Sequence, residues 1–146
     1  MTPDKFFTKQ EQYDIKTAVK EAELNTSGEI RVHIEKDLKG DPLDRAAYLF
    51  ERLDMHKTKE RNGILFYLAV DSKKFAILGD AGINSKVPEN FWDNIKDQMS
   101  ENFKKGNFTE GLTTGIVLTG EQLKKHFPYQ TDDVNELSDE ISFGKN

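Results

Sequence analysis

Hydrophobic and polar residues alternate with two different periods along this chain, and the two periods predict different elements. A helical period predicts four helices, over residues 4–24, 42–55, 88–103 and 109–126. A period of two predicts a strand over residues 29–36. The run from Ile64 to Val70 is apolar throughout, which is typical of a central strand covered on both faces. A short turn then leads to residues 75–78, so these two strands should form an antiparallel hairpin.

The order of these elements predicts the class of the fold. A helix, a strand, a helix, two strands and two helices follow one another, which predicts an α/β protein with a small sheet between two helix layers. Residues 1–128 should form one domain, which is the usual number for a chain of 146 residues. The helix at 109–126 contains three glycines, which weaken a helix but permit close approach to a neighbour: Gly111, Gly115 and Gly120.

Residues 129–146 form an acidic tail. From Thr131 onward, five acidic residues against Lys145 give the tail a net charge of −4, out of −5 for the whole chain. Packing of the tail on the domain and full solvation are equal alternatives at this point. Five apolar residues would carry the packing: Tyr129, Val134, Leu137, Ile141 and Phe143.

Composition excludes several classes of function. The chain has no cysteine, so it has no disulfide, no thiol nucleophile and no zinc site built on thiolates. The charge is not basic, so we expect no nucleic-acid binding. No apolar run reaches the roughly 20 residues of a membrane helix, and the start MTPDKFFTKQEQYD has no apolar signal core. We therefore expect a soluble, cytoplasmic monomer that does not insert into membranes.

The familiar catalytic and nucleotide-binding motifs are missing. The chain contains no G-x-S-x-G, no phosphate-binding loop of the Walker type and no G-x-G-x-x-G. A serine or threonine nucleophile needs a base nearby, and only His33, His56 and His126 could supply one. Because His33 lies on the polar side of a strand and the other two follow helix ends, we interpret all three as structural or solvated.

One oxygen-rich loop is the best candidate for a binding site. It follows the strand at 75–78 and contains Asp80 and Asn84, four residues apart, while Glu89 lies in the first turn of the helix predicted from residue 88. Glycines at 79 and 82 let the backbone turn its carbonyls inward. Oxygen ligands of this kind suit Ca²⁺ or Mg²⁺ rather than zinc or copper. In the alternative interpretation, Asp80 binds loop amides and Glu89 interacts with the helix dipole.

Two further acids could join this site, depending on strand direction. If strands 29–36 and 64–70 are parallel, Glu29 and the loop around Glu60 lie at the same sheet end as Asp80. Acids that converge in this way repel one another unless a cation neutralises them. If the strands are antiparallel, the neighbours would be different acids: Asp37, Asp41 and Asp44.

Several segments together resemble the TPM domain family. They are TSGEIRV (26–32), RNGILFYLA (61–69), FAILGDAGINSKV (75–87), FKKGNF (103–108) and EGL (110–112). The resemblance covers roughly residues 8–126 and is greatest to small stand-alone versions from bacteria of the Bacteroidetes type. It implies a three-layer αβα sandwich around a mostly four-stranded mixed sheet, whose fourth strand would come from a segment predicted as loop.

The resemblance also implies a function. Plant members act in chloroplast thylakoids and are described as acid phosphatases, and members bind Ca²⁺ or related ions in loops at one sheet edge. Most relatives have a signal peptide and an anchor or glycine-rich tail, and their loop reads G-x-G-L-E, so Asn84 replaces a glutamate while Asp80 adds a charge. We therefore expect a divalent-metal-binding domain, calcium before magnesium, in which the metal orders the loop. The alternatives are a metal-assisted phosphatase and an adaptor that binds an unknown protein partner.

Overall fold

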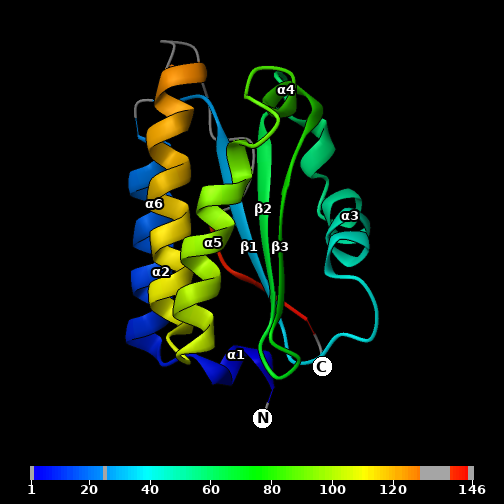
Figure 1. Ribbon diagram of the computed structural model, residues 1–146, viewed down its shortest axis with the longest axis vertical. Helices are drawn as coiled ribbons and strands as arrows, with labels where there is room; N and C mark the ends of the chain where they lie inside the picture. Colours follow the sequence, from blue (N-terminus) through cyan, green and yellow to red (C-terminus); the bar gives the residue numbers. More distant parts are fainter. Residues whose placement is uncertain (1, 25, 129–138, 145–146) are drawn as a thin grey trace.

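The computed structural model describes residues 2–24, 26–128 and 139–144 (Figure 1). Its helices, with one short 3-10 helix named η1, are α1 (Pro3–Phe6), α2 (Lys9–Glu23), α3 (Pro42–Arg52), η1 (Met55–Lys57), α4 (Ala81–Asn84), α5 (Phe91–Lys104) and α6 (Phe108–His126). Its strands are β1 (Glu29–Glu35), β2 (Gly63–Ala69), β3 (Lys74–Gly79) and β4 (Ser142–Phe143).

The four strands form one mixed sheet in the order β3-β2-β1-β4. β1 runs parallel to β2, and β2 pairs with β3 in the predicted antiparallel hairpin. The parallel direction of β1 decides between the two arrangements that the sequence left open. It brings the start of β1, the start of β2 and the end of β3 to the same edge of the sheet, as the metal-site hypothesis requires.

Helices cover the sheet on both sides, which confirms the predicted αβα sandwich. In Figure 1, α2, α5 and α6 lie to the left of the sheet and α3 lies to its right. Every residue of β2 is buried, because Ile64, Phe66 and Leu68 face the first helix layer while Leu65 and Tyr67 face the second. The apolar run therefore predicted a central strand correctly.

The helix predicted over residues 4–24 is in fact two helices. α1 ends at Phe6, and a second helix, α2, begins after Thr8, which caps it. The Thr8 hydroxyl accepts a hydrogen bond from the Glu11 amide at 3.0 Å, and the Glu11 carboxylate accepts one from the Thr8 amide at 2.9 Å. This reciprocal capping box satisfies two amides that would otherwise lack partners, and so it fixes the start of α2.

Two other helix predictions need correction. The loop expected at 79–87 contains the short helix α4, and the helix expected from residue 88 begins only at Phe91. In α3, Leu43 and Ala47 are exposed, whereas Ala46, Leu49 and Phe50 are buried. The face of α3 that is buried is set by its position, since α3 lies mainly against β3 and β2.

The fourth strand comes from the acidic tail. β4 pairs parallel to β1, and the Gly144 amide donates to the Ile34 carbonyl at 2.8 Å. Ile141 and Phe143 are partly buried against the main core. The other apolar residues of the tail lie outside the described residues: Tyr129, Val134 and Leu137. No helix in the described ranges is both long and apolar enough to span a membrane.

Candidate functional site

The predicted site lies at the sheet edge where β3 leads into α4. The Asp80 amide donates to the Gly63 carbonyl at 3.0 Å, which ties the end of β3 to the start of β2. The Gly82 amide donates to the Arg61 carbonyl at 2.8 Å, so α4 packs directly on the loop before β2. A Cβ at Gly82 would lie 2.1 Å from the Glu60 carbonyl oxygen, so only glycine permits this close approach.

Asp80 is buried and paired with a cationic side chain of the chain itself. Its side chain is 5% exposed, and both of its oxygens accept hydrogen bonds from Arg61, from Nε at 2.7 Å and from Nη2 at 2.8 Å. Asp80 also caps α4 by accepting from the Ala81 amide at 2.7 Å. The Arg61 side chain is 51% exposed, and its hydrogen bond to Asp80 raises the pKa of the guanidinium. Arg61 therefore supplies the positive charge that a buried carboxylate requires.

Asn84 has its side-chain amide engaged within the same loop. Its Nδ2 donates to the Gly79 carbonyl at 2.9 Å, and its Oδ1 accepts from Trp92 Nε1 at 3.4 Å. These bonds close the turn between β3 and α5.

Glu60 and Glu89 are exposed on either side of this loop. Glu60 accepts a long hydrogen bond from Asn62 Nδ2 at 3.4 Å. Glu89 lies in the turn before α5 and not in a helix, because Asn90 is the residue that precedes the first helical position. The helical position predicted for Glu89 is therefore wrong.

Glu29, the fifth predicted ligand, belongs to a different group of acids. It is buried and lies close enough to Glu23 to raise the pKa of that carboxyl. Burial, a hydrogen bond with Asp139 and the charges of Asp139 and Glu29 together raise the pKa of Glu23 to about 9. Glu23 Oε2 also accepts from the Ile30 amide at 2.8 Å. The structure therefore places Glu29 with Glu23 and Asp139.

The five predicted ligands do not converge on one point. Across residues 2–24, 26–128 and 139–144, no three acidic or histidine side chains are arranged to hold a metal ion. Asp80 is satisfied by Arg61 and Asn84 by its own loop, so the donor set as it stands does not form a cation cage. Both oxygens of Asp80 already accept hydrogen bonds from the Arg61 guanidinium.

A polar cluster that the sequence did not predict lies on the α3 side of the sheet. Ser142 Oγ lies 2.9 Å from His33 Nδ1, and His33 Nε2 lies 3.4 Å from Glu35 Oε2. Glu35 also accepts two hydrogen bonds from Arg45, at 2.9 and 2.6 Å, and one from Tyr67 at 2.6 Å. Burial alone would raise the pKa of Glu35, but the bonds from His33, Arg45 and Tyr67 outweigh it and hold that pKa far below its usual range.

The sequence pattern of β1 indicates two members of this cluster but not the third. The alternation puts His33 and Glu35 on the same face, but the sequence does not show that a serine of the acidic tail lies opposite His33. That contact depends on the pairing of β4, and a strand of two residues has no detectable period.

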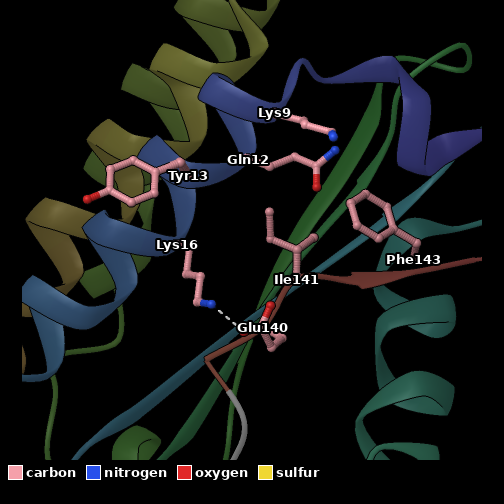
Figure 2. Close-up of a pocket in the computed structure, with 7 residues that line it drawn as sticks. All are labelled: Lys9, Gln12, Tyr13, Lys16, Glu140, Ile141 and Phe143. Atoms are coloured by element: carbon pink, nitrogen blue, oxygen red, sulfur yellow. Dashed lines mark hydrogen bonds and ion pairs between the residues drawn. The ribbon is translucent and has the colours of Figure 1, made fainter.

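A separate cavity of about 230 Å³ lies between α2 and the C-terminal segment (Figure 2). Its lining residues are Lys9, Gln12, Tyr13, Lys16, Glu140, Ile141 and Phe143. The only carboxylate among them, Glu140, is bonded to Lys16, as the dashed line in Figure 2 shows. This cavity is therefore unsuited to a cation.

Comparison with known proteins places this geometry in a family. The model of the TPM domain matches residues 1–122. The NMR structure of BA42 protein from the psychrophilic bacterium Bizionia argentinensis is 47% identical, with a TM-score of 0.90, and the match covers 97% of each chain. The comparison with curated proteins finds no match.

Two more distant structures share the fold alone. The N-terminal domain of a protein from P. gingivalis is 20% identical with a TM-score of 0.68, over 86% of this chain and 84% of that one. The N-terminal domain of cg2496 protein from Corynebacterium glutamicum is 12% identical with a TM-score of 0.65, over 81% and 74%.

Proposed function

We propose that this chain, which belongs to the TPM domain family, binds a divalent cation at the sheet edge where β3 leads into α4. Calcium is the first candidate and magnesium the second, since every side-chain donor there is an oxygen. The ligands would come from the predicted set at this edge, with Asp80 at the centre. Glu60, Asn84 and Glu89 would be recruited from the flanking turns, whereas Glu29 stays with Glu23.

A single observation carries this proposal, which is the pairing of Asp80 with Arg61. Asp80 is almost fully buried, and a buried carboxylate is stable only beside a positive charge. The guanidinium that supplies this charge is half exposed and reaches Asp80 from a loop, so it can leave at little cost in packing. We infer that Arg61 holds the place of the cation in the metal-free protein, and that cation and guanidinium compete for the same two oxygens.

Calorimetric titration of EDTA-treated protein with Ca²⁺ and with Mg²⁺ tests this competition. Asp80→Asn removes the central charge and should abolish binding. Arg61→Gln removes the competitor and should tighten binding by about tenfold, equivalent to about 1.4 kcal/mol. Lys57→Gln is the matched control, since it removes one positive charge near the loop but pairs with Asp54 and not with Asp80.

The experiment is decisive because Asp80→Asn should weaken cation binding while Arg61→Gln should strengthen it. If Arg61 is only a structural partner of Asp80, Arg61→Gln will lower the melting temperature and no variant will bind calcium. If Lys57→Gln tightens binding as much as Arg61→Gln does, the effect is one of general charge and the proposed competition does not exist.

A metal-assisted phosphatase is the second candidate function. It is favoured by the same exchange, because Arg61 displaced by a cation would be free to contact a phosphoryl oxygen beside the metal. Hydrolysis of p-nitrophenyl phosphate should then require the cation and be lost in Asp80→Asn. Arg61→Gln should bind the cation more tightly and yet hydrolyse more slowly. Equal rates in wild-type protein and Asp80→Asn would exclude this activity.

A further inference from the structure

Ser142, His33 and Glu35 bring a hydroxyl, an imidazole and a carboxylate together in that order. The register of β4 on β1 places Ser142 opposite His33, with Oγ at 2.9 Å from Nδ1. On the other side of the ring, Nε2 is buried without a hydrogen-bond partner, and Glu35 Oε2 lies 3.4 Å away, a distance that would shorten when the ring takes a proton. This is the order of groups through which a base activates a serine nucleophile.

The partners of Glu35 determine which nitrogen of His33 carries the hydrogen. Arg45 and Tyr67 keep Glu35 ionised, so Glu35 can only accept hydrogen bonds. The hydrogen of a neutral His33 ring is therefore best placed on Nε2, facing Glu35. Nδ1 then presents its lone pair to the Ser142 hydroxyl, which is the arrangement a general base requires.

The cluster lies at β4, the outermost strand of the sheet within the described residues, and near the buried guanidinium of Arg31. Ser142 is half buried, and α3 lies mainly against β3 and β2, although its Arg45 reaches Glu35. Arg31 shares the face of His33 and lies two positions earlier in β1, about 7 Å along the strand. Its Nε is buried without an acceptor, and it forms no ion pair with any residue of the described ranges. A desolvated guanidinium of this kind attracts an anion.

We propose that Ser142 is the nucleophile of a metal-independent esterase site for carboxylic esters whose acyl group carries a negative charge. Oγ attacks the carbonyl carbon while its proton passes to His33 Nδ1. The bond to the alcohol oxygen breaks, and the alcohol leaves with that proton. A water molecule, deprotonated by His33, then cleaves the acyl-serine bond, releasing the acid and restoring the hydroxyl. Arg31 binds the charged end of the acyl group.

Labelling with a fluorophosphonate probe in EDTA tests the nucleophile, because this probe reacts with activated serines and requires no metal. Intact-mass and peptide analysis should find one adduct, on Ser142. Ser142→Ala should abolish it, and His33→Gln should slow it by about 100-fold or more. Ser100→Ala, a change on α5 far along the chain from the cluster, should have no effect. A folded wild-type protein without an adduct, or with the adduct elsewhere, overturns the proposal.

A cysteine in the same place keeps the test valid if Ser142→Ala disturbs β4. Ser142→Cys should react with iodoacetamide at pH 7 about tenfold faster than Ser100→Cys, because His33 would stabilise the thiolate. Equal alkylation rates in two folded variants would show that His33 does not activate this position.

Two ester substrates test the role of Arg31. The mono-p-nitrophenyl ester of succinic acid should be hydrolysed faster than p-nitrophenyl acetate, and Arg31→Gln should slow the first by about tenfold while sparing the second. Equal losses on both esters would overturn the proposed substrate class. Labelling and turnover should be the same in EDTA as in excess calcium, so this proposal and the cation proposal can fail independently.

Discussion

At the scale of single residues, the buried carboxylates differ in whether a cationic side chain pairs with them. Asp80 is balanced by Arg61, and Glu35 is balanced by Arg45. Glu23 has no such cationic partner among the interactions that set its pKa, and it instead shares a hydrogen bond with Asp139. The three carboxylates are all removed from water to different degrees, yet only Glu23 is driven to hold a proton near neutral pH.

Glu23 should therefore make stability depend on pH. Its pKa is about 9 in the folded protein against 4.5 for the ordinary group, so the folded state keeps a proton that the unfolded chain releases. The stabilisation is complete below pH 4.5 and is lost as pH rises toward 9, by up to about 1.4 kcal/mol per pH unit. Glu23→Gln mimics the protonated form and should be more stable than the wild type at pH 8 by about 1 to 3 kcal/mol.

Urea unfolding at pH 5, 6.5 and 8 measures this difference, which should shrink toward pH 5. Glu21→Gln, an exposed change on the same helix, is the control and should show no such trend. A constant difference between Glu23→Gln and wild type across the three pH values would contradict the assignment of the proton to Glu23.

At the scale of elements, α6 packs tightly against α2 and α5 through its glycines. A Cβ at Gly120 would lie 2.6 Å from the Cβ and 2.8 Å from the Cα of Ala22, so α2 would have to move. The three atoms nearest to a Cβ at Gly115 all belong to the flexible side chain of Met99, with its sulfur at 2.4 Å. The close approach that the glycines predicted is thus confirmed, but the two positions differ in what must yield.

Alanine substitutions should separate these two glycines. Gly120→Ala should lower the free energy of unfolding by about 1 to 3 kcal/mol, because the backbone of α2 cannot yield as a side chain can. Gly115→Ala should change it by less than about 1 kcal/mol, since the gain in helix propensity offsets the repacking of Met99. Thermal unfolding of both variants provides the measurement. If Gly115→Ala proves as damaging as Gly120→Ala, Met99 is more rigidly held than the structure indicates.

The strands with strong hydrophobic patterns were predicted well, because such a pattern lies within the segment itself. β1, β2 and β3 each differ by at most one residue at either end from the predicted strands, because alternation and apolar runs are properties of the segment itself. The break between α1 and α2 was missed because Phe7 fits the helical period, although the capping box at Thr8 was present in the sequence. β4 and the pairing of Asp80 with Arg61 depend on contacts between distant segments, which a local pattern does not contain.

At the scale of the whole molecule, the C-terminal segment joins α2 to the sheet. Ile141 and Phe143 face the core, Lys16 of α2 binds Glu140, and β4 extends the sheet beyond β1. The cavity in Figure 2 lies inside this junction, between α2 and the segment. The attachment therefore combines apolar packing and backbone pairing with side-chain contacts, which are the ion pair at the surface, the bond of Asp139 with Glu23 and the contact of Ser142 with His33.

Removing residues 139–146 should cost far more than breaking the ion pair. Lys16→Ala should lower the free energy of unfolding by less than about 1 kcal/mol, because Glu140 is largely exposed and surface pairs contribute little. The truncation should cost about 2 kcal/mol or more, since it uncovers the surface beneath Ile141 and Phe143. Urea unfolding of both variants compares them. A truncated protein as stable as Lys16→Ala would mean that β4 contributes little to the folded state.

The position of β4 in chain order has a consequence for synthesis on the ribosome. Every other element of the sandwich emerges from the ribosome before Ser142 does. The edge of β1 that pairs with β4 therefore remains unpaired until β4 has been synthesised. A bare strand edge is a template for pairing with another chain. Nascent copies on neighbouring ribosomes are therefore most prone to aggregate in the interval between the folding of β1 and the docking of its last partner.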